Sequence, residues 1–429
     1  MASIKIDTTE IIGKIKPLHG VGQPPLGGIG RNRNKHFHYL TEAGIPYSRL
    51  HDVDGAFAGN KYVDIPNIFR DFSKDEFDPA SYDFAFTDAL ITDLVAAGVE
   101  PYYRLGVTIE NYAEIKSYYI DPPADYEKWA RICEHIIAHY TEGWADGFHY
   151  NITYWEIWNE PDDGARVSQM WNGTAEDYYR LYDVTAKHLK KRFPHLKIGG
   201  YAATGFEAVT ATEPVPWGDR MEYWMKFFHG FMKYIKEHGS PIDYFSWHCY
   251  RGASKAVKEA RWLKQQLDEY GYPDIETHLN EWNPNCNNRG TARHSADVAA
   301  VMLGLQNEHV HVMTFYDARM GGLYGGLFNP MTYKPWHAYY SLVAFNMLYQ
   351  LGDQARLECD TEGLYAVCAT NGKRSTLVIS NISGNTQDLN ITGAELDGAR
   401  WYCIDEARLM SWSCPVNYIE NNQVLVIEF

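Results

Sequence analysis

The sequence has no long hydrophobic run and no cysteine pairs at zinc-binding spacing. No apolar stretch approaches the roughly 18 residues that a membrane-spanning helix needs, so no membrane partner is expected. Met1-Ala2-Ser3 leads directly into charged sequence without an apolar leader segment. We therefore expect a cytoplasmic protein unless a signal has been trimmed. The seven cysteines form no CxxC pair, and their odd number excludes a full intrachain disulfide framework. Buried, reduced cysteines are the expectation.

Positive charge is also scarce. The chain has 39 lysine and arginine residues against 55 aspartate and glutamate residues, a formal net charge of -16. Such a surface repels nucleic-acid phosphates and anionic lipids. The most basic stretch, 31–35, is too short for a nucleic-acid patch and fits a loop that leads into a helix. No nucleic-acid partner is expected.

Several cofactor and nucleophile motifs are missing as well. The glycines at 20–22 and 27–30 lack the spacing of phosphate-binding loops, and no GxSxG serine-hydrolase motif occurs. The His-x-His pairs at 36–38 and 309–311 do not fall at the end of a first barrel strand, where barrel hydrolases often carry metal ligands. We expect no cofactor and no metal.

What the chain does contain is an ordinary globular composition over 429 residues, with 45% hydrophobic and 22% charged residues. The aromatic share of 15% is high, which is a weak indication of sugar stacking because large cores also use many aromatics. The length allows one large domain with an accessory module.

Short apolar segments alternate with amphipathic helical segments over most of the chain. The expected strands are 18–22, 46–51, 100–106, 152–159, 197–202, 243–250, 276–282 and 311–317. The expected helices are 83–98, 126–140, 175–192, 220–238, 254–270, 292–307 and 335–349. Eight such units predict an α/β fold, a (β/α)₈ TIM barrel, at residues 11–351.

After residue 352 the pattern changes to short strands separated by turn signals. These strands are expected at 364–369, 374–382, 388–392 and 424–429. With an N-terminal strand at residues 1–10, they predict a small antiparallel, β-sandwich-like accessory module at 352–429. The module either packs on the barrel or contributes to a homo-oligomer interface.

Two glutamates stand at predicted strand ends, and each follows an asparagine. Glu160 lies in WNEPD at the end of the fourth strand and Glu281 in LNEWN at the end of the seventh. Catalytic groups of such barrels sit at the carboxyl ends of the strands, so these two face each other across the mouth. Paired carboxyl groups across a sugar-sized cleft are what glycoside hydrolysis requires. Burial among aromatics would raise the pKa of Glu160 and suit it to donate a proton.

These motifs resemble glycoside hydrolase family 39 of clan A, which includes β-xylosidases and α-L-iduronidases. Arg49-Leu50-His51, the WNEP segment around Glu160, the strand-six stretch from Ser246 to Tyr250 and the segment around Glu281 follow the family order. The likeness runs over about 18–351. It implies a retaining mechanism, with Glu160 as acid/base and Glu281 as nucleophile.

Further residues have physical roles beside this resemblance. Asn159 is expected to donate its amide to a sugar 2-hydroxyl, or else to cap the turn after the strand. His248 and Tyr250 share one strand face, so Tyr250 could bond Glu281 and His248 a hydroxyl, unless both are packed barrel side chains. His51 could bind hydroxyls of the terminal sugar or lie in a surface loop.

Arg49 could keep Glu281 ionised through a charge-assisted bond, or form a structural barrel salt bridge. Trp282 either supports the nucleophile from behind or touches sugar. Tyr316 could stack on the sugar where the family usually shows a tryptophan, while Asp317 and Arg319 add charge that a plain xylose site would not need. A long loop at 209–219, with Trp217, could wall off or extend the cleft.

The leading hypothesis is an exo-acting, β-xylosidase-like retaining glycosidase that acts on an oligosaccharide or glycoside. The first alternative is an endo-acting enzyme of the same clan, or one specific for arabinose, galactose or a uronate. The second is a non-catalytic carbohydrate-binding protein on the same scaffold, against which the pair of intact glutamates argues.

Overall fold

Eight parallel strands form a closed barrel in the computed structural model, which describes residues 2–27, 34–53, 63–109, 120–165, 168–212, 218–321 and 324–429. In barrel order from the first, the strands are β2 (Gly20–Gly22), β5 (Tyr47–Leu50), β6 (Glu100–Leu105), β7 (Tyr154–Ile157), β8 (Lys197–Ala203), β9 (Tyr244–Cys249), β10 (Glu276–Trp282) and β11 (Val312–Tyr316). The predicted TIM barrel is confirmed.

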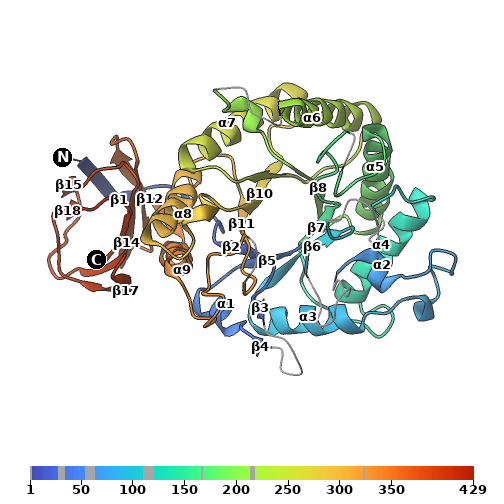
Figure 1. Cartoon of the computed structure of the whole chain (residues 1–429), viewed down its shortest axis with the longest axis horizontal. Coiled ribbons are helices and arrows are strands. Elements are labelled where there is room, and N and C mark those ends of the chain that lie inside the picture. The colour runs from blue at the N-terminus through green and yellow to red at the C-terminus, as the bar shows by residue number, and fades with distance from the viewer. Residues whose placement is uncertain are drawn as a thin grey trace.

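Helices surround the barrel on its outside (Figure 1). They are α1 (His38–Glu42), α2 (Ile65–Ile68), α3 (Ala85–Ala96), α4 (Tyr126–Thr141), α5 (Ala175–Arg192), α6 (Gly218–His238), α7 (Ala253–Tyr270), α8 (Ala292–Leu305) and α9 (His337–Tyr349). Local sequence sets several of their ends. Thr174 and Asp177 form a reciprocal capping box at the start of α5, and basic residues fill its last turn, where they complement the helix dipole.

Barrel strands pack so closely that two positions need glycine. A Cβ atom on Gly20 would lie 2.7 Å from the Met313 carbonyl oxygen, and one on Gly199 would lie 2.3 Å from that of Tyr244. A separate cluster of Tyr102, Tyr154, Tyr244 and Val312 fills the barrel interior. The barrel is thus a packed core, and a ligand must bind at its mouth.

The accessory module is a nine-stranded, mainly antiparallel sheet beside the barrel (Figure 1). Its strands are β1 (Ala2–Lys14), β12 (Asp353–Cys359), β13 (Leu364–Thr370), β14 (Ser375–Asn381), β15 (Gln387–Thr392), β16 (Arg400–Asp405), β17 (Arg408–Ser413), β18 (Tyr418–Ile419) and β19 (Gln423–Glu428). One face packs against α8 and α9, and the other has its own core. Strand β1 joins this sheet by pairing with β12 and β15, and it continues past residue 10.

The short strands β3 (Leu26–Gly27) and β4 (Asn34–Lys35) form a separate pair. All seven cysteines are free, and Cys414 is exposed, so the expectation of burial is wrong for that residue. In the part of the chain that the structure describes, no helix is long and apolar enough to span a membrane.

Candidate active site

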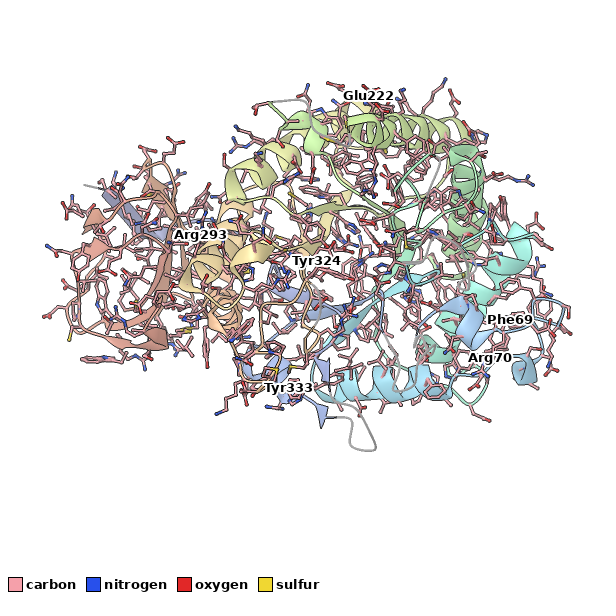
Figure 2. The ribbon with its side chains drawn as sticks, viewed as in Figure 1. Phe69, Arg70, Glu222, Arg293, Tyr324 and Tyr333 are labelled. Atoms are coloured by element: carbon pink, nitrogen blue, oxygen red, sulfur yellow. The ribbon has the colours of Figure 1, made fainter. Side chains whose placement is uncertain are left out.

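A cavity of about 430 Å³ opens at the carboxyl ends of the barrel strands. Tyr324 lies over the middle of the barrel in Figure 2 and is one of the residues that line this cavity. The lining comprises His51, Asp52, Thr108, Ile109, Glu160, Asp163, Gln169, Thr204, Glu207, Arg220, Trp224, Tyr250, Glu281, Tyr316, Arg319 and Tyr324. The volume is that of a small-molecule site.

Glu160 and Glu281 both line the cavity and lie close together. Three atoms lie within 4.8 Å of one another: one carboxylate oxygen of Glu160, one carboxylate oxygen of Glu281 and one ring nitrogen of His248. Glu281 is 7% exposed. The structure therefore brings together two nearly buried carboxyl groups from opposite sides of the barrel, at a spacing that a metal ion could also use.

An irregular backbone turns Glu160 toward the cavity. Trp158 and Glu160 both have positive φ, 72° and 43°, in the region that residues other than glycine seldom occupy. Backbone hydrogen bonds hold both residues, from the Trp158 N–H to the Leu105 carbonyl at 2.8 Å and from the Glu160 N–H to the Ala202 carbonyl at 3.1 Å. Strained backbone of this kind concentrates at functional sites because the surroundings must over-determine it.

His248 lies between the two carboxyl groups. Its Nδ1 is 2.7 Å from Glu160 Oε1, and its Nε2 is 3.6 Å from Glu281 Oε2. The ring is fully buried, and this burial lowers the pKa of His248 to about 4. A neutral ring at pH 7 has one N–H to donate, so it can orient a carboxyl group without adding charge.

Glu281 has two donors that favour its ionised form. The Tyr250 hydroxyl donates to Oε1, and Arg49 Nη1 lies 3.2 Å from Oε2. Burial raises the pKa of Glu281 to about 7, and the neighbouring Glu160 adds to this, while Arg49 and the Tyr250 bond act in the opposite direction. The carboxyl group is thus poised to ionise near neutral pH.

Glu160 is less well stabilised as an anion. Burial raises its pKa to about 7, and Arg220 and Arg49 oppose this only through longer-range charge. The hydrogen-bond partner recorded for its carboxyl group in the described part of the chain is His248. When the pair holds a single proton, that proton therefore favours Glu160 over Glu281.

Arg49 anchors the floor of the site. Its fully buried guanidinium donates to Glu156 at 2.8 Å and to the Asn159 Oδ1 at 2.6 Å, besides contacting Glu281. Ser246 and Asn280 donate to the other Glu156 oxygen. The Asn159 amide nitrogen is buried and has no acceptor in the described regions. A ligand hydroxyl at this point would satisfy it.

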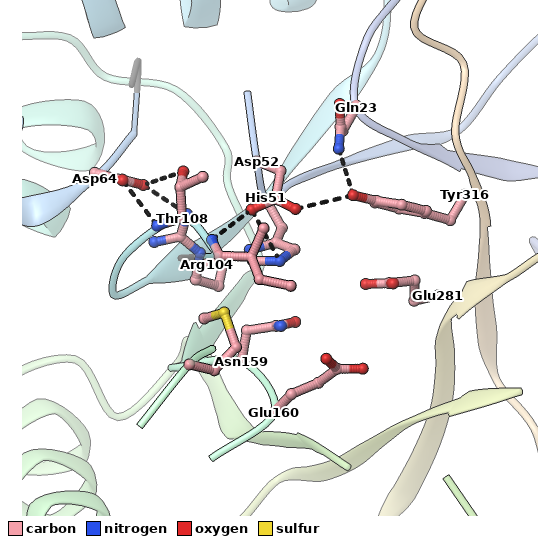
Figure 3. A network of polar contacts seen from close by, with 12 residues as sticks. Gln23, His51, Asp52, Asp64, Arg104, Thr108, Asn159, Glu160, Glu281 and Tyr316 are labelled. Carbon is pink, nitrogen blue, oxygen red and sulfur yellow. Dashed lines mark hydrogen bonds and ion pairs between the residues drawn. The ribbon is translucent and has the colours of Figure 1, made fainter. Parts of the chain in front are cut away.

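His51 and Tyr316 lie on the opposite side of the opening from Glu160, as Figure 3 shows. Both line the cavity, and Asp52 links them. The Tyr316 hydroxyl donates to Asp52 Oδ2 at 3.0 Å, and His51 Nε2 is 3.2 Å from Asp52 Oδ1. Sequence reasoning missed Asp52, although it directly follows His51 at a strand end.

Trp282 is not brought to the cavity. It is fully buried, and its ring meets Phe315 edge to face with centroids 5.3 Å apart. Arg319 lines the cavity and lies 3.5 Å from the buried Asp317. Trp217 lies outside the described residues.

The wall on the Glu160 side comes largely from α6 and the loops before it. Arg220 contacts Asp163 and lies 5.4 Å from the ring centre of Trp224. The indole N–H of Trp224 has no acceptor among the described residues, although the ring is only 5% exposed. No short motif in the sequence marked Arg220 and Trp224, because they come from helix α6 and not from a strand end.

The family model described as "Glycosyl hydrolases family 39" matches residues 59–348. A β-xylosidase from Geobacillus stearothermophilus is 25% identical over 209 residues, which cover 47% of this chain and 37% of that protein. A β-xylosidase from Caldicellulosiruptor saccharolyticus is 26% identical over 224 residues, covering 47% of this chain and 41% of the relative. The chain thus matches less than half the length of either relative.

Two solved structures have a similar fold over nearly all of both chains. One is a glucosidase from Croceicoccus marinus, 20% identical with a TM-score of 0.76, covering 100% of this chain and 98% of that one. The other is a GH39 β-xylosidase from Caulobacter crescentus, 17% identical with a TM-score of 0.68, covering 99% of each chain. At these identities the likeness shows a shared fold.

Proposed function

The chain belongs to glycosyl hydrolase family 39, and we propose on this premise that it is a retaining O-glycoside hydrolase with Glu160 as acid/base and Glu281 as nucleophile. The observation that carries the proposal is the pair of nearly buried carboxyl groups in one cavity, with one oxygen of each within 4.8 Å of the other. A double displacement needs two carboxyl groups close together, one as acid/base and one as nucleophile.

In the first step, a carboxylate oxygen of Glu281 attacks the anomeric carbon while Glu160 gives its proton to the glycosidic oxygen. The bond to the leaving group breaks, the aglycone departs as an alcohol, and a glycosyl ester with Glu281 remains. In the second step, Glu160 takes a proton from water. The water oxygen attacks the anomeric carbon, the ester bond breaks and Glu281 is released as a carboxylate. Two inversions give net retention.

The division of roles follows from the partners of each carboxyl group. Tyr250 and Arg49 contact Glu281 directly, which suits a group that must begin the reaction ionised. Glu160 has no such cation in contact and retains its proton more readily. His248 contacts both and serves as a positioning residue.

Carboxyl spacing supports retention over inversion. Retaining glycosidases place these groups about 5–5.5 Å apart, whereas inverting enzymes leave about 6.5–9.5 Å to admit a water molecule. One oxygen of Glu160 lies within 4.8 Å of one oxygen of Glu281, and this close approach favours the shorter class. The product anomer formed first, followed by NMR, tests this directly, since an inverted anomer contradicts the mechanism.

We propose a neutral, xylose-like sugar as the glycone, in line with the two relatives described as β-xylosidases. The charges of the cavity support neutrality. Arg220 is paired with Asp163 and Arg319 with Asp317, while the reacting glutamates and Asp52 make the site acidic. A uronate would meet repulsion here. Exo action is part of the same proposal, because the linked Asp52 and Tyr316 side chains bound the cavity on the side away from Glu160.

A panel of aryl xyloside, arabinoside, galactoside, glucoside and uronide tests activity and specificity together. Turnover of the xyloside and its loss in Glu281→Ala are expected, with the arabinoside and galactoside as the nearest competitors. Cleavage inside polysaccharides without release of terminal sugars would indicate the endo-acting alternative. Activity should survive dialysis against EDTA, and its loss would assign the spacing of Glu160, His248 and Glu281 to a metal. No turnover of any substrate refutes the proposal.

A further inference from the structure

Asp52 occupies an unusual position at the end of β5. It directly follows His51, has a φ of 54° and is 9% exposed. Aspartate is one of the few residues that tolerate a left-handed backbone, because its short polar side chain can bond locally. The chain turns sharply here, and Asp52 lines the cavity instead of continuing the strand.

Two hydrogen-bond donors and a neighbouring imidazole ring surround this carboxylate. The Ile109 N–H donates to Oδ1 at 2.9 Å, the Tyr316 hydroxyl donates to Oδ2 at 3.0 Å, and His51 Nε2 lies 3.2 Å from Oδ1. Gln23 in turn donates to the Tyr316 oxygen at 2.6 Å. These contacts, drawn in Figure 3, fix the direction of the carboxylate.

The fixed carboxylate still has capacity to accept a hydrogen bond. An ionised carboxylate offers about four lone-pair sites, and these contacts use about three of them. In the described regions Asp52 forms no ion pair with lysine or arginine. Arg104, the arginine labelled in Figure 3, pairs with Asp64 at 2.7 Å. Arg104 opposes the increase in the pKa of Asp52 that burial causes, but it acts through longer-range charge and makes no ion pair with Asp52 in the described part of the chain. A further donor would therefore stabilise this nearly buried carboxylate, and the cavity that it lines can hold one.

The side of the cavity on which Asp52 lies determines which part of a substrate it meets. Glu160 protonates the leaving oxygen, so the aglycone lies on the Glu160 side, and the terminal sugar extends the other way. Figure 3 shows Asp52 and Tyr316 on that other side, with Glu281 between them and Glu160. The end of the sugar ring away from the anomeric carbon carries the C3 and C4 hydroxyls.

We propose that Asp52 is a glycone-binding residue that determines specificity: its carboxylate accepts a hydrogen bond from the C3 or C4 hydroxyl of the terminal sugar. The inference rests on the proposed hydrolase function. It adds a recognition residue that discriminates among neutral sugars by the presence and orientation of one hydroxyl. The contact is charge-assisted, so it is stronger than a bond between neutral groups.

The test compares kcat/KM for the best aryl glycoside with kcat/KM for its 2-, 3- and 4-deoxy analogues. The native protein should lose about 10- to 150-fold with either the 3- or the 4-deoxy substrate, the value of a hydrogen bond to a charged group. In Asp52→Ala, activity on the parent should fall by a similar factor, and the penalty for that one deoxy position should disappear. The penalties at the other positions should remain.

Two variants separate recognition from a structural effect. Glu207→Gln changes another cavity carboxyl group, one that lies 2.5 Å from Arg251, and should leave the deoxy pattern unaltered. Tyr316→Phe removes one donor to Asp52 but keeps the carboxylate, so the penalty should persist. If Asp52→Ala does not fold, Asp52→Asn keeps the size of the side chain and removes its charge: the penalty for that one deoxy position should fall, and an unchanged penalty contradicts the recognition role.

Each outcome has a separate meaning. If the native protein turns over a glycoside but its deoxy penalties are the same in Asp52→Ala, the recognition role is wrong and the hydrolase function stands. If Asp52→Ala reduces the penalties at several deoxy positions by different amounts, a single contact is also contradicted. If no aryl glycoside is turned over, the proposed function fails, and this inference fails with it.

Discussion

Replacing Tyr250 with phenylalanine should shift the pH dependence of catalysis. The Tyr250 hydroxyl donates to Glu281, and that bond opposes the increase in the pKa of Glu281 that burial causes. A hydrogen bond to a charged group is worth about 1.5–3 kcal/mol. Since one pKa unit corresponds to about 1.4 kcal/mol, its loss should raise the pKa of Glu281 by about 1 to 2 pH units.

The optimum of a bell-shaped profile lies midway between the pKa values of the two groups. Burial raises the pKa values of Glu160 and Glu281 to about 7, so the native kcat/KM profile should be narrow and centred near pH 7. In Tyr250→Phe the optimum should move up by about 0.5 to 1 pH unit, which is half the increase in the pKa of Glu281, because the pKa of Glu160 stays where it is. Its height should also fall, because Glu281 then binds the proton more tightly than Glu160.

The assay is kcat/KM for an aryl glycoside from about pH 4 to pH 10. Tyr324→Phe is a matched control, since Tyr324 lines the same cavity with its ring 5.0 Å from that of Tyr250 and makes no hydrogen bond to Glu281 within the described part of the chain. Its optimum should stay at the native pH. A Tyr250→Phe profile that falls equally at every pH, with its optimum unmoved, would refute the reasoning and assign Tyr250 to substrate contact alone.

Three further predictions concern the same site. Glu160→Gln should be more stable than the native protein by up to about 3 kcal/mol above pH 7, because burial raises the pKa of Glu160 from its ordinary 4.5 to about 7. In thermal unfolding at a series of pH values, this gain in stability should develop as the pH rises from 4.5 to about 7 and should be absent below pH 4.5. A gain that does not depend on pH contradicts the prediction. Glu156→Ala should lower the free energy of unfolding by about 3–5 kcal/mol, since it removes the nearer of the two carboxylates that pair with the buried Arg49 charge. Urea denaturation measures the free energy of unfolding, and a change under about 1 kcal/mol would contradict a stabilising role for the Arg49–Glu156 ion pair. Asn159→Ala should lower kcat/KM by about 10-fold on an aryl glycoside and much less on its 2-deoxy analogue. Equal losses on both would exclude the 2-hydroxyl contact.

Much of the architecture follows from local sequence. Alternating apolar segments and amphipathic helices predict the barrel, because strand and helix periodicities depend on neighbouring residues only. The rule that reactive groups gather at strand ends then singles out Glu160 and Glu281 before any coordinates are known. Both line the cavity.

Side-chain directions at the strand ends could not be predicted in this way. The pairing of β10 with both neighbours shifts register after Leu279, so strict alternation does not apply to Glu281 and Trp282. This irregularity decides that Glu281 enters the cavity while Trp282 is buried against Phe315. Positive φ at Asp52, directly after the Arg49-Leu50-His51 segment, likewise turns a side chain into the cavity.

The sequence by itself determined the (β/α)₈ class, the family and the two carboxyl groups, since periodicity and short motifs are properties of adjacent residues. Only the tertiary structure decided what surrounds those groups. The contacts of Arg49 with Glu156 and Glu281, and of Asp52 with Tyr316, join residues far apart in the chain. Burial and distance, which set the pKa values of Glu160 and Glu281, arise when the barrel closes and removes both groups from water.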